Sequence, residues 1–205
     1  MKQEIPAGHS IVTNGFVGPN HVMFNHSENV WKPAPAVFYG DKIEIGYPTV
    51  LVKNSKVELF LDLEGTIIRS WHDPEIINLE KIKGYIREFG VTKVCIFSYA
   101  IRNETDQATF EKQYRGFLEE KLGVTITQVP TVEHIKQPCL KFYPKAVPMY
   151  DFEFVNVWTK QRAFIDNCTH RYITDNAVCV LLDDVVQNMT MVIEDKNLTI
   201  RTIKI

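Results

Sequence analysis

The 205-residue sequence lacks long apolar runs, Cys-x-x-Cys pairs and a strong net charge. A helix that crosses a bilayer needs about 20 apolar residues, so we expect no transmembrane segment and no membrane partner. The four cysteines are spread along the chain, and three lie among apolar neighbours, which predicts buried thiols in the reducing cytoplasm. A formal net charge of -2 excludes a broad positive field for non-specific nucleic-acid binding but leaves room for a local basic groove.

Internal repeats, low-complexity tracts and an apolar signal core in the first ten residues are also absent from the sequence. We therefore expect a cytoplasmic protein in which Asn-x-Ser/Thr triplets, such as residues 25–27, carry no glycan. The sequence does contain enough apolar material, 45% of its residues, for one sizeable core. This composition predicts one domain, with an appendage at most.

Residues 1–55 differ from the rest of the chain because they are rich in Gly, Pro, Asn and His. Three short β-favouring runs occur in this part, at 36–40, 42–46 and 49–53, separated by turn residues. We interpret it as a β-rich appendage whose strands extend the sheet or pair with a second copy to form a homo-oligomer. No ligand spacing connects the histidines of this part, so we expect no metal site among His9, His21 and His26.

From Val57 onward, apolar runs alternate with segments of helical periodicity, and two of these segments end at a glycine. In chain order the patterns are a strand at 57–63, a helix at 73–90, a strand at 91–99, a helix at 106–123, a strand at 124–129, a helix at 159–174 and a strand at 177–184. Such alternation predicts that residues 56–205 form an α/β domain with a doubly wound, Rossmann-like parallel sheet.

One segment, 136–156, breaks this rhythm with three prolines and three lysines, and we expect an irregular lid or insertion there. Lysines alternate in it with aromatic residues, as they do on nucleotide-binding surfaces. The residues concerned are Lys136, Lys141, Lys145, Phe142, Tyr143 and Tyr150. The simpler interpretation is a solvated loop held by apolar anchors, so nucleotide binding is a hypothesis here.

Acidic residues follow two of the predicted strands. Asp62 and Glu64 end the first apolar run, and the pair Asp183-Asp184 ends the last one. In an open parallel sheet, ligands bind outside the carboxyl ends of the strands, so folding would bring these distant acids together. Several carboxylates at one edge repel one another unless a divalent cation neutralises them, and oxygen-only ligands suit Mg²⁺. Each acid alone could equally be a helix N-cap.

The combination of motifs resembles the haloacid dehalogenase-like (HAD) hydrolases. The stretch "FLDLEGTIIRS" resembles their first motif, an apolar run followed by Asp-x-Asp-Gly-Thr. The strand "VCIFSY" ends in Ser98 like the second motif, and "VCVLLDDVVQN" ends in Asp-Asp with Asn188 nearby, like the fourth. Lys160 stands at the head of the preceding helix, where the family has its lysine. The resemblance covers roughly residues 57–205.

This resemblance implies a phosphatase mechanism. Asp62 would attack a phosphoryl group and form an aspartyl-phosphate. The Asp62 carboxylate, the Glu64 main-chain carbonyl and Asp183 or Asp184 would hold Mg²⁺ against the phosphate oxygens. Ser98 would hydrogen-bond the phosphate, and Lys160 would neutralise the intermediate.

Glu64 departs from the family pattern, which has Asp at this position as the general acid. The two acids have similar reference pKa values, about 4.3 and 3.9. The extra methylene nevertheless moves the carboxylate by roughly 1.5 Å, and a misplacement of about 1 Å can lower a rate about a hundredfold. Two interpretations follow: a phosphatase adapted to the longer acid, or a weakened enzyme kept for binding.

A second enzyme class shares part of the pattern. The DEDD-type 3′–5′ exonucleases also begin with Asp-x-Glu on a strand, and His170 with Asp175 matches the spacing of their last motif. Those enzymes hold two metals with four carboxylates. The middle motif here has no convincing Asp, and the exonuclease interpretation leaves the Asp183-Asp184 strand unexplained.

The interval between Asp62 and Ser98 has room for a loop and one helix but not for a large cap domain. An open site favours a bulky phosphorylated substrate, such as a nucleic-acid end or a protein side chain, or an oligomer whose neighbour covers the mouth. A third interpretation is an idle HAD-like scaffold that binds a partner through residues 1–55.

Overall fold

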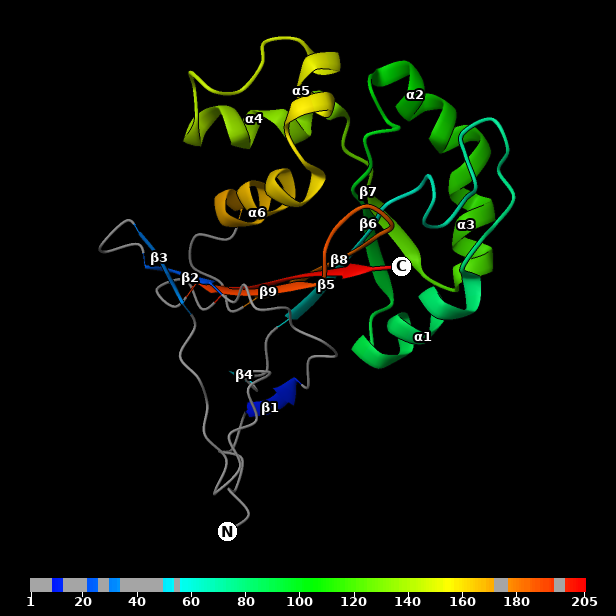
Figure 1. Ribbon diagram of the computed structural model, residues 1–205. Coiled ribbons are helices and arrows are strands. Elements are labelled where there is room, and N and C mark those ends of the chain that lie inside the picture. The colour runs from blue at the N-terminus through cyan, green and yellow to red at the C-terminus, as the bar shows by residue number, and fades with distance from the viewer. Residues whose placement is uncertain are drawn as a thin grey trace.

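The computed structural model describes residues 9–12, 22–25, 30–33, 50–53, 56–171, 177–193 and 198–205 (Figure 1). Its centre is an open sheet of six strands in the order β7-β6-β5-β8-β10-β9. Within this sheet four neighbouring pairs are parallel, and the edge strand β9 runs antiparallel to β10. The strands are β5 (Lys56–Leu61), β6 (Lys93–Ile96), β7 (Thr125–Gln128), β8 (Ala177–Asp183), β9 (Met189–Ile193) and β10 (Leu198–Lys204).

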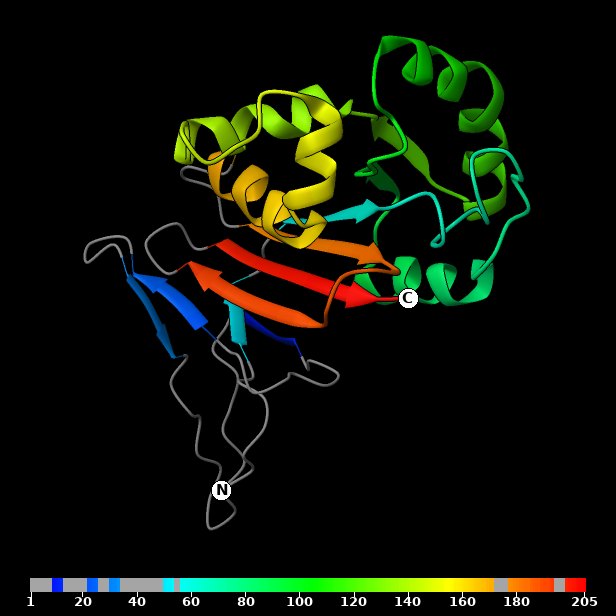
Figure 2. The ribbon, with the colours of Figure 1, turned by 45° about the horizontal axis from the view of Figure 1, so that its top comes forward.

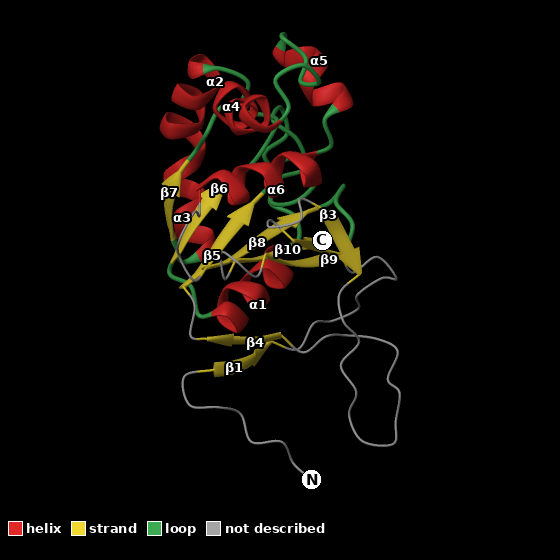
Figure 3. Cartoon of the chain, turned by 90° about the vertical axis from the view of Figure 1, so that its left-hand side faces the viewer, coloured by secondary structure: helices red, strands yellow, loops and turns green. Residues whose placement is uncertain are grey.

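Helices cover both faces of the sheet (Figures 2 and 3). They are α1 (Leu79–Phe89), α2 (Glu104–Thr109), the π-helical turn η1 (Phe110–Tyr114), α3 (Arg115–Leu122), α4 (Val132–Phe142), α5 (Asp151–Val157) and α6 (Lys160–Arg171). The first face packs against α1, η1 and α3, and the second against α4, α5 and α6. No helix in the described part of the chain is long and apolar enough to cross a membrane.

Alternating side chains of the central strands supply both cores. Leu59 and Leu61 of β5 point into the core on the α1 side, whereas Phe60 points into the core on the α6 side. All seven residues of β8 are buried. This two-sided burial explains why the strands read as continuous apolar runs, and it confirms the expected α/β class with a mostly parallel sheet.

Two of the predicted helices end where their glycines indicate. Gly90 and Gly123 follow α1 and α3 with φ angles of 61° and 70°, the left-handed conformation that glycine adopts without strain. The predicted helix 73–90 begins later, at Leu79, because Ile76 instead bridges antiparallel to Ile68. The predicted helix 106–123 is α2, η1 and α3 in succession.

The expectation of an irregular segment at 136–156 is wrong for most of its length, because α4 and α5 occupy it. Val132, Ile135 and Cys139 are buried at helical spacing, and Thr131 caps α4 through a capping box with His134. Pro138 lies inside α4 without ending it. The sequence-based prediction gave the prolines more weight than the helical spacing of the apolar residues, and the structure follows that spacing.

Lys136 is not a surface lysine, which corrects its expected place in a nucleotide-binding surface. Its side chain is buried between α4 and α5. The ammonium lies 2.6 Å from the Glu133 carboxylate and 2.5 Å from that of Asp151, and it donates to the Met149 carbonyl at 2.9 Å. Lys136 therefore fastens α5 to α4.

The N-terminal part contains two small antiparallel pairs among its described residues. β1 (His9–Val12) pairs with β4 (Val50–Lys53), and β2 (Val22–Asn25) pairs with β3 (Val30–Pro33). β4 confirms the strand expected at 49–53. The runs expected at 36–40 and 42–46, together with His21 and His26, lie outside the described residues.

Candidate active site

Two acidic residues lie side by side where the central strands end. Asp62 follows β5 and Asp183 ends β8, and these parallel strands pair in a register that sets Leu61 opposite Leu182. The Asp62 amide donates to the Leu182 carbonyl at 3.0 Å. Carboxylate oxygens of Asp62, Asp183 and Asp184 all lie within 4.8 Å of one another. The structure therefore brings together acids that stand about 120 residues apart in the sequence, as a parallel sheet requires.

Lys160 bridges the two buried carboxylates. Its ammonium lies 2.5 Å from Asp62 Oδ1 and 3.2 Å from Asp183 Oδ2. It is the first residue of α6, whose N-terminus faces the strand ends because α6 leads back to the start of β8. Burial acts to lower the pKa of Lys160, but the charges of Asp62 and Asp183 outweigh it, so that its pKa is raised and the ammonium is retained.

Burial raises the pKa of Asp62 to about 6. Among the influences on the pKa of this carboxyl group, burial is the largest. The ammonium of Lys160 acts in the opposite direction, and the Asp183 carboxylate adds to the rise. Hydrogen bonding from the Ser98 hydroxyl also lowers the pKa of Asp62, which places Ser98 at the same site. Asp62 is therefore a carboxylate at neutral pH, but a poorly solvated one.

Asp183 is held in a fixed orientation by the turn that follows it. Its Oδ1 accepts hydrogen bonds from the amides of Val185 and Val186 at 2.8 and 3.1 Å. Its Oδ2 is thereby directed to Lys160. The carboxylate thus presents one oxygen to the backbone and the other to the site.

The Gly-Thr turn after β5 fits tightly against Asp184. A Cβ atom on Gly65, whose φ is +75°, would lie 2.4 Å from Asp184 Oδ2, so a side chain at this position would displace that carboxylate. The Thr66 hydroxyl accepts from the Asp184 amide at 3.1 Å and lies 3.4 Å from Asp62 Oδ2. Gly65 and Thr66 therefore set the distance between the two acids.

The Glu64 carboxylate lies outside the carboxylate cluster. It is exposed, and its Oε1 accepts a hydrogen bond from the Trp71 amide at 2.5 Å. Trp71 belongs to a hairpin-like loop and stacks on Tyr114 with ring centroids 4.7 Å apart. The structure thus places Asp62, Ser98, Lys160, Asp183 and Asp184 together, while the side chain of Glu64 points to the loop.

The donor set fits a hard divalent cation. Asp62 Oδ1 and Asp183 Oδ2 are buried, and within the described residues each is paired with the Lys160 ammonium rather than with a neutral hydrogen-bond donor. One ammonium offsets only part of the charge of three carboxylates. A cation with oxygen ligands, such as Mg²⁺, would supply the remaining compensation.

Tyr99 belongs to the site but escaped sequence analysis. The Lys160 ammonium lies 5.4 Å from the centre of the Tyr99 ring, within reach of a cation–π interaction. The Tyr99 hydroxyl donates to the Trp158 carbonyl at 2.9 Å, just before α6 begins. The position of Tyr99 directly after Ser98 was the one sign in the sequence that it could belong to the site. An aromatic residue at a strand end does not, however, indicate that it will contact a lysine from another element.

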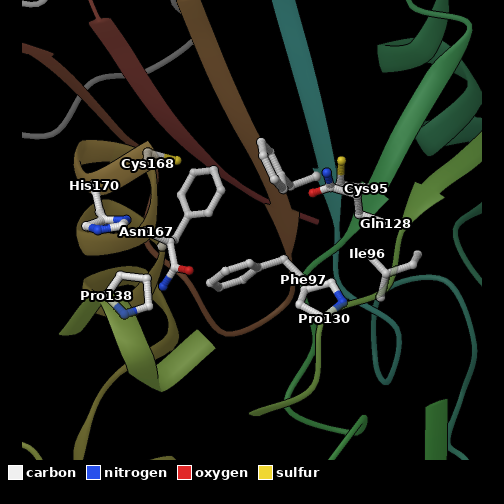
Figure 4. Close-up of a pocket in the computed structure, with 11 residues that line it drawn as sticks. Cys95, Ile96, Phe97, Gln128, Pro130, Pro138, Asn167, Cys168 and His170 are labelled. Carbon is white, nitrogen blue, oxygen red and sulfur yellow. The ribbon is translucent and has the colours of Figure 1, made fainter. Parts of the chain in front are cut away.

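His170, which the exonuclease interpretation requires, lies elsewhere. It is ten residues along α6 from Lys160, or about 15 Å of helix axis. It lines a separate, mainly apolar cavity of about 410 Å³ between α4, α6 and the sheet, where Figure 4 shows it with Asn167 on the helix side and Phe97 opposite. Asp175 lies outside the described residues.

Asn188 also does not join the cluster: it is exposed, and its Oδ1 accepts a hydrogen bond from the Lys204 amide at 2.8 Å.

Scans against protein-family models, curated proteins and solved structures found no match to the chain.

Proposed function

We propose that the protein is a Mg²⁺-dependent phosphohydrolase that acts through an aspartyl-phosphate on Asp62, as the resemblance to HAD hydrolases implies. The observation that carries this proposal is the buried Asp62 carboxylate, 2.5 Å from the Lys160 ammonium and clustered with Asp183 and Asp184 at the strand ends. A carboxylate that is poorly solvated, fixed and flanked by a cation is suited to nucleophilic attack.

The chemistry balances with the residues at hand. An Asp62 oxygen attacks the phosphorus, the bond from phosphorus to the substrate oxygen breaks, and that oxygen takes a proton from Glu64. Water then gives a proton to Glu64 and attacks the phosphorus, which releases inorganic phosphate and regenerates Asp62. Lys160 holds the Asp62 carboxylate and offsets developing charge, and Ser98 donates to a phosphate oxygen.

Mg²⁺ would be held by Asp62, the Glu64 main-chain carbonyl, Asp183 and Asp184. When bound, it would offset the repulsion between an anionic nucleophile and an anionic substrate. Removal of Mg²⁺ should therefore abolish phosphate release.

The position of Glu64 favours a second candidate, a protein that binds phosphoryl groups with slow turnover. For proton transfer the Glu64 carboxylate has to leave the Trp71 amide and turn toward the substrate, because proton transfer requires contact within about 3 Å. Replacement Glu64→Asp shortens the acid by one methylene. An increase of kcat on this change would identify Glu64 as the cause of slow turnover, whereas a decrease would indicate a pocket adapted to Glu.

A nucleotide or nucleic-acid phosphate is the substrate class we propose. Lys141, Lys145, Phe142 and Tyr150 are exposed on the α4–α5 segment. The Lys141 ammonium lies 2.7 Å from the His170 ring near the end of α6. Tyr143 is half-buried below Arg162, whose guanidinium carbon lies 4.4 Å from the ring centre. If Lys141→Ala left the KM unchanged for all nucleotides tried, this substrate class would be wrong.

The test of the function is phosphate release from a panel of phosphomonoesters, with and without Mg²⁺. We expect Mg²⁺-dependent release that disappears in Asp62→Asn, with accumulation of an acid-stable, base-labile phosphoprotein in the wild type under substrate excess. Release that persists in Asp62→Asn would exclude the proposed nucleophile. Digestion of single-stranded DNA without phosphomonoesterase activity would favour the exonuclease class instead.

A further inference from the structure

A second cavity, of about 300 Å³, lies between α1 and the β9–β10 edge of the sheet, elements seen together in Figure 3. Residues of three elements line it, among them Tyr85 and Glu88 of α1, Thr190 of β9, and Arg201 and Lys204 of β10. None of the three clustered aspartates lines this cavity. It is therefore separate from the candidate active site.

Arg201 is the unusual residue of this cavity. Arg201 is only 5% exposed to solvent. Its Nη1 atom is buried and has no hydrogen-bond partner among the described residues. Within those residues no carboxylate forms an ion pair with the guanidinium. The contact found is with the Phe89 ring, whose centre lies 5.6 Å from the guanidinium carbon. A cation–π contact compensates only part of the lost hydration.

The charge of Arg201 is only partly compensated by its surroundings. Burial lowers the pKa of Arg201, and the charge of Glu88 acts in the opposite direction. The group stays protonated even so, because guanidinium has a pKa above about 12 and cannot shed its proton to relieve the burial. A buried charge without a partner is strongly destabilising, so a strand position that retains one calls for a counter-ion.

The charge of the cavity indicates the sign of that counter-ion. Its lining contains two cations, Arg201 and Lys204, and one acid, Glu88. Tyr85 adds a hydroxyl group on the α1 side. The planar guanidinium fork matches the two oxygens of a carboxylate or a phosphate. The volume is at the lower end of the range of small-molecule pockets, so the ligand is small.

We propose that this cavity is a binding site for a small oxyanion, a carboxylate or phosphate group held by the Arg201 guanidinium with Lys204 at the rim. The proposal does not depend on the phosphohydrolase function. Such a ligand would supply the acceptor that Arg201 Nη1 lacks and would tie β10 to α1.

The test is a titration of the isotope-labelled full chain by nuclear magnetic resonance, in Mg²⁺-free buffer. Inorganic phosphate and succinate are added separately, with sodium chloride at equal ionic strength as the reference. We expect saturable shifts of the Arg201 side-chain Nε signal and of the Tyr85 and Thr190 amides with at least one of the two anions. The anion that saturates identifies the source, phosphate or carboxylate.

Variants decide whether the guanidinium is responsible. Arg201→Met keeps the length of the side chain and should weaken anion binding roughly tenfold to a hundredfold, the effect of losing charge-assisted hydrogen bonds. Arg201→Lys keeps the charge but loses the fork, so binding should be intermediate, and this variant decides if Arg201→Met does not fold. Exposed Arg102→Met is the matched control and should bind like the wild type. Absence of saturable shifts in the wild type, or equal affinity in Arg201→Met and Arg201→Lys, would overturn the proposal.

Discussion

At the scale of single residues, the site depends on groups that hold one another in place. Asp62 is buried beside Lys160, which in turn lies over the ring of Tyr99. The Tyr99 hydroxyl donates a hydrogen bond to the Trp158 carbonyl, shortly before α6 begins, and so fixes the position of that ring. The Tyr99 ring thus helps to hold the Lys160 ammonium in place. Without the ring, the ammonium would be free to move away from the carboxylates.

Replacement of Tyr99 should separate the role of the ring from that of the hydroxyl. Cation–π contacts contribute about 0.5–2 kcal/mol, so we expect Tyr99→Leu to lower kcat about threefold to thirtyfold with little change of KM. Tyr99→Phe keeps the ring and should retain most of the activity. The measurement is steady-state phosphate release in Mg²⁺. Equal losses in the two variants would show that the hydroxyl, rather than the ring, supports Lys160.

Asp62 should make the stability of the metal-free protein depend on pH. Its pKa in the folded state, about 6, lies above the ordinary 3.8, so the folded state binds the proton more tightly than the unfolded state. This contribution to stability is present below about pH 4 and is lost as the pH rises through about 6. Relative to Asp62→Asn, the wild type should lose on the order of 2 kcal/mol between these limits.

Urea unfolding of both proteins with a chelator, over the same pH series, measures this difference. The free energies of unfolding should diverge as the pH rises, with Asp62→Asn the more stable partner toward neutral pH. Parallel curves would mean that Lys160 fully compensates the burial of Asp62.

At the scale of elements, the sequence predicted those parts whose pattern depends on local neighbours. The apolar runs of β5, β6 and β8 and the glycines after α1 and α3 were sufficient to place the sheet and two helix ends. Because parallel strands end at one edge, the meeting of Asp62 with Asp183 also followed from the pattern. The edge strand β9 and its partner β10 were not predicted, because β10 lacks the continuous apolar run that marks β8: its polar residues Thr199, Arg201 and Thr202 are buried only by tertiary packing.

The α4–α5 segment shows what a local pattern cannot provide. Three prolines suggested a loop, yet the buried contact of Lys136 with Glu133 and Asp151 belongs to two helices that the sequence alone does not bring together. Tyr99 and Lys160, 61 residues apart, meet for the same reason. Side-chain partners across elements depend on the packed structure, whereas strand ends depend on topology alone.

Lys136 gives a prediction for this segment. Lys136→Met removes the ammonium that joins α4 to α5 and leaves the exposed Glu133 and the partly buried Asp151 without their partner, so we expect a loss of roughly 1–3 kcal/mol in the free energy of unfolding. The exposed Lys141→Met is the matched control and should change stability by less than about 0.5 kcal/mol. Urea unfolding measures both variants. A neutral Lys136→Met would show that apolar packing alone fastens α5.

At the scale of the whole molecule, the carboxylate cluster links the first strand of the α/β part to its fourth parallel strand. Asp62 and Asp183 stand on neighbouring strands at the centre of the sheet, and Gly65 holds Asp184 against them. An unfolded chain has no such cluster, because the acids are then far apart. A ligand that requires all three acids binds only the folded chain and must stabilise the entire sheet.

Mg²⁺ should accordingly raise the thermal unfolding midpoint. At a free concentration about 100 times the dissociation constant, the folded state gains about 2.7 kcal/mol, which corresponds to a rise of about 5–10 °C for a domain of this size. Asp183→Asn should remove most of this rise, since it replaces a charged ligand at the centre of the cluster. Asp73→Asn, on the exposed loop, should keep it. Calorimetry with and without chelator measures the shift, and a rise that survives in Asp183→Asn would place the bound cation elsewhere in the molecule.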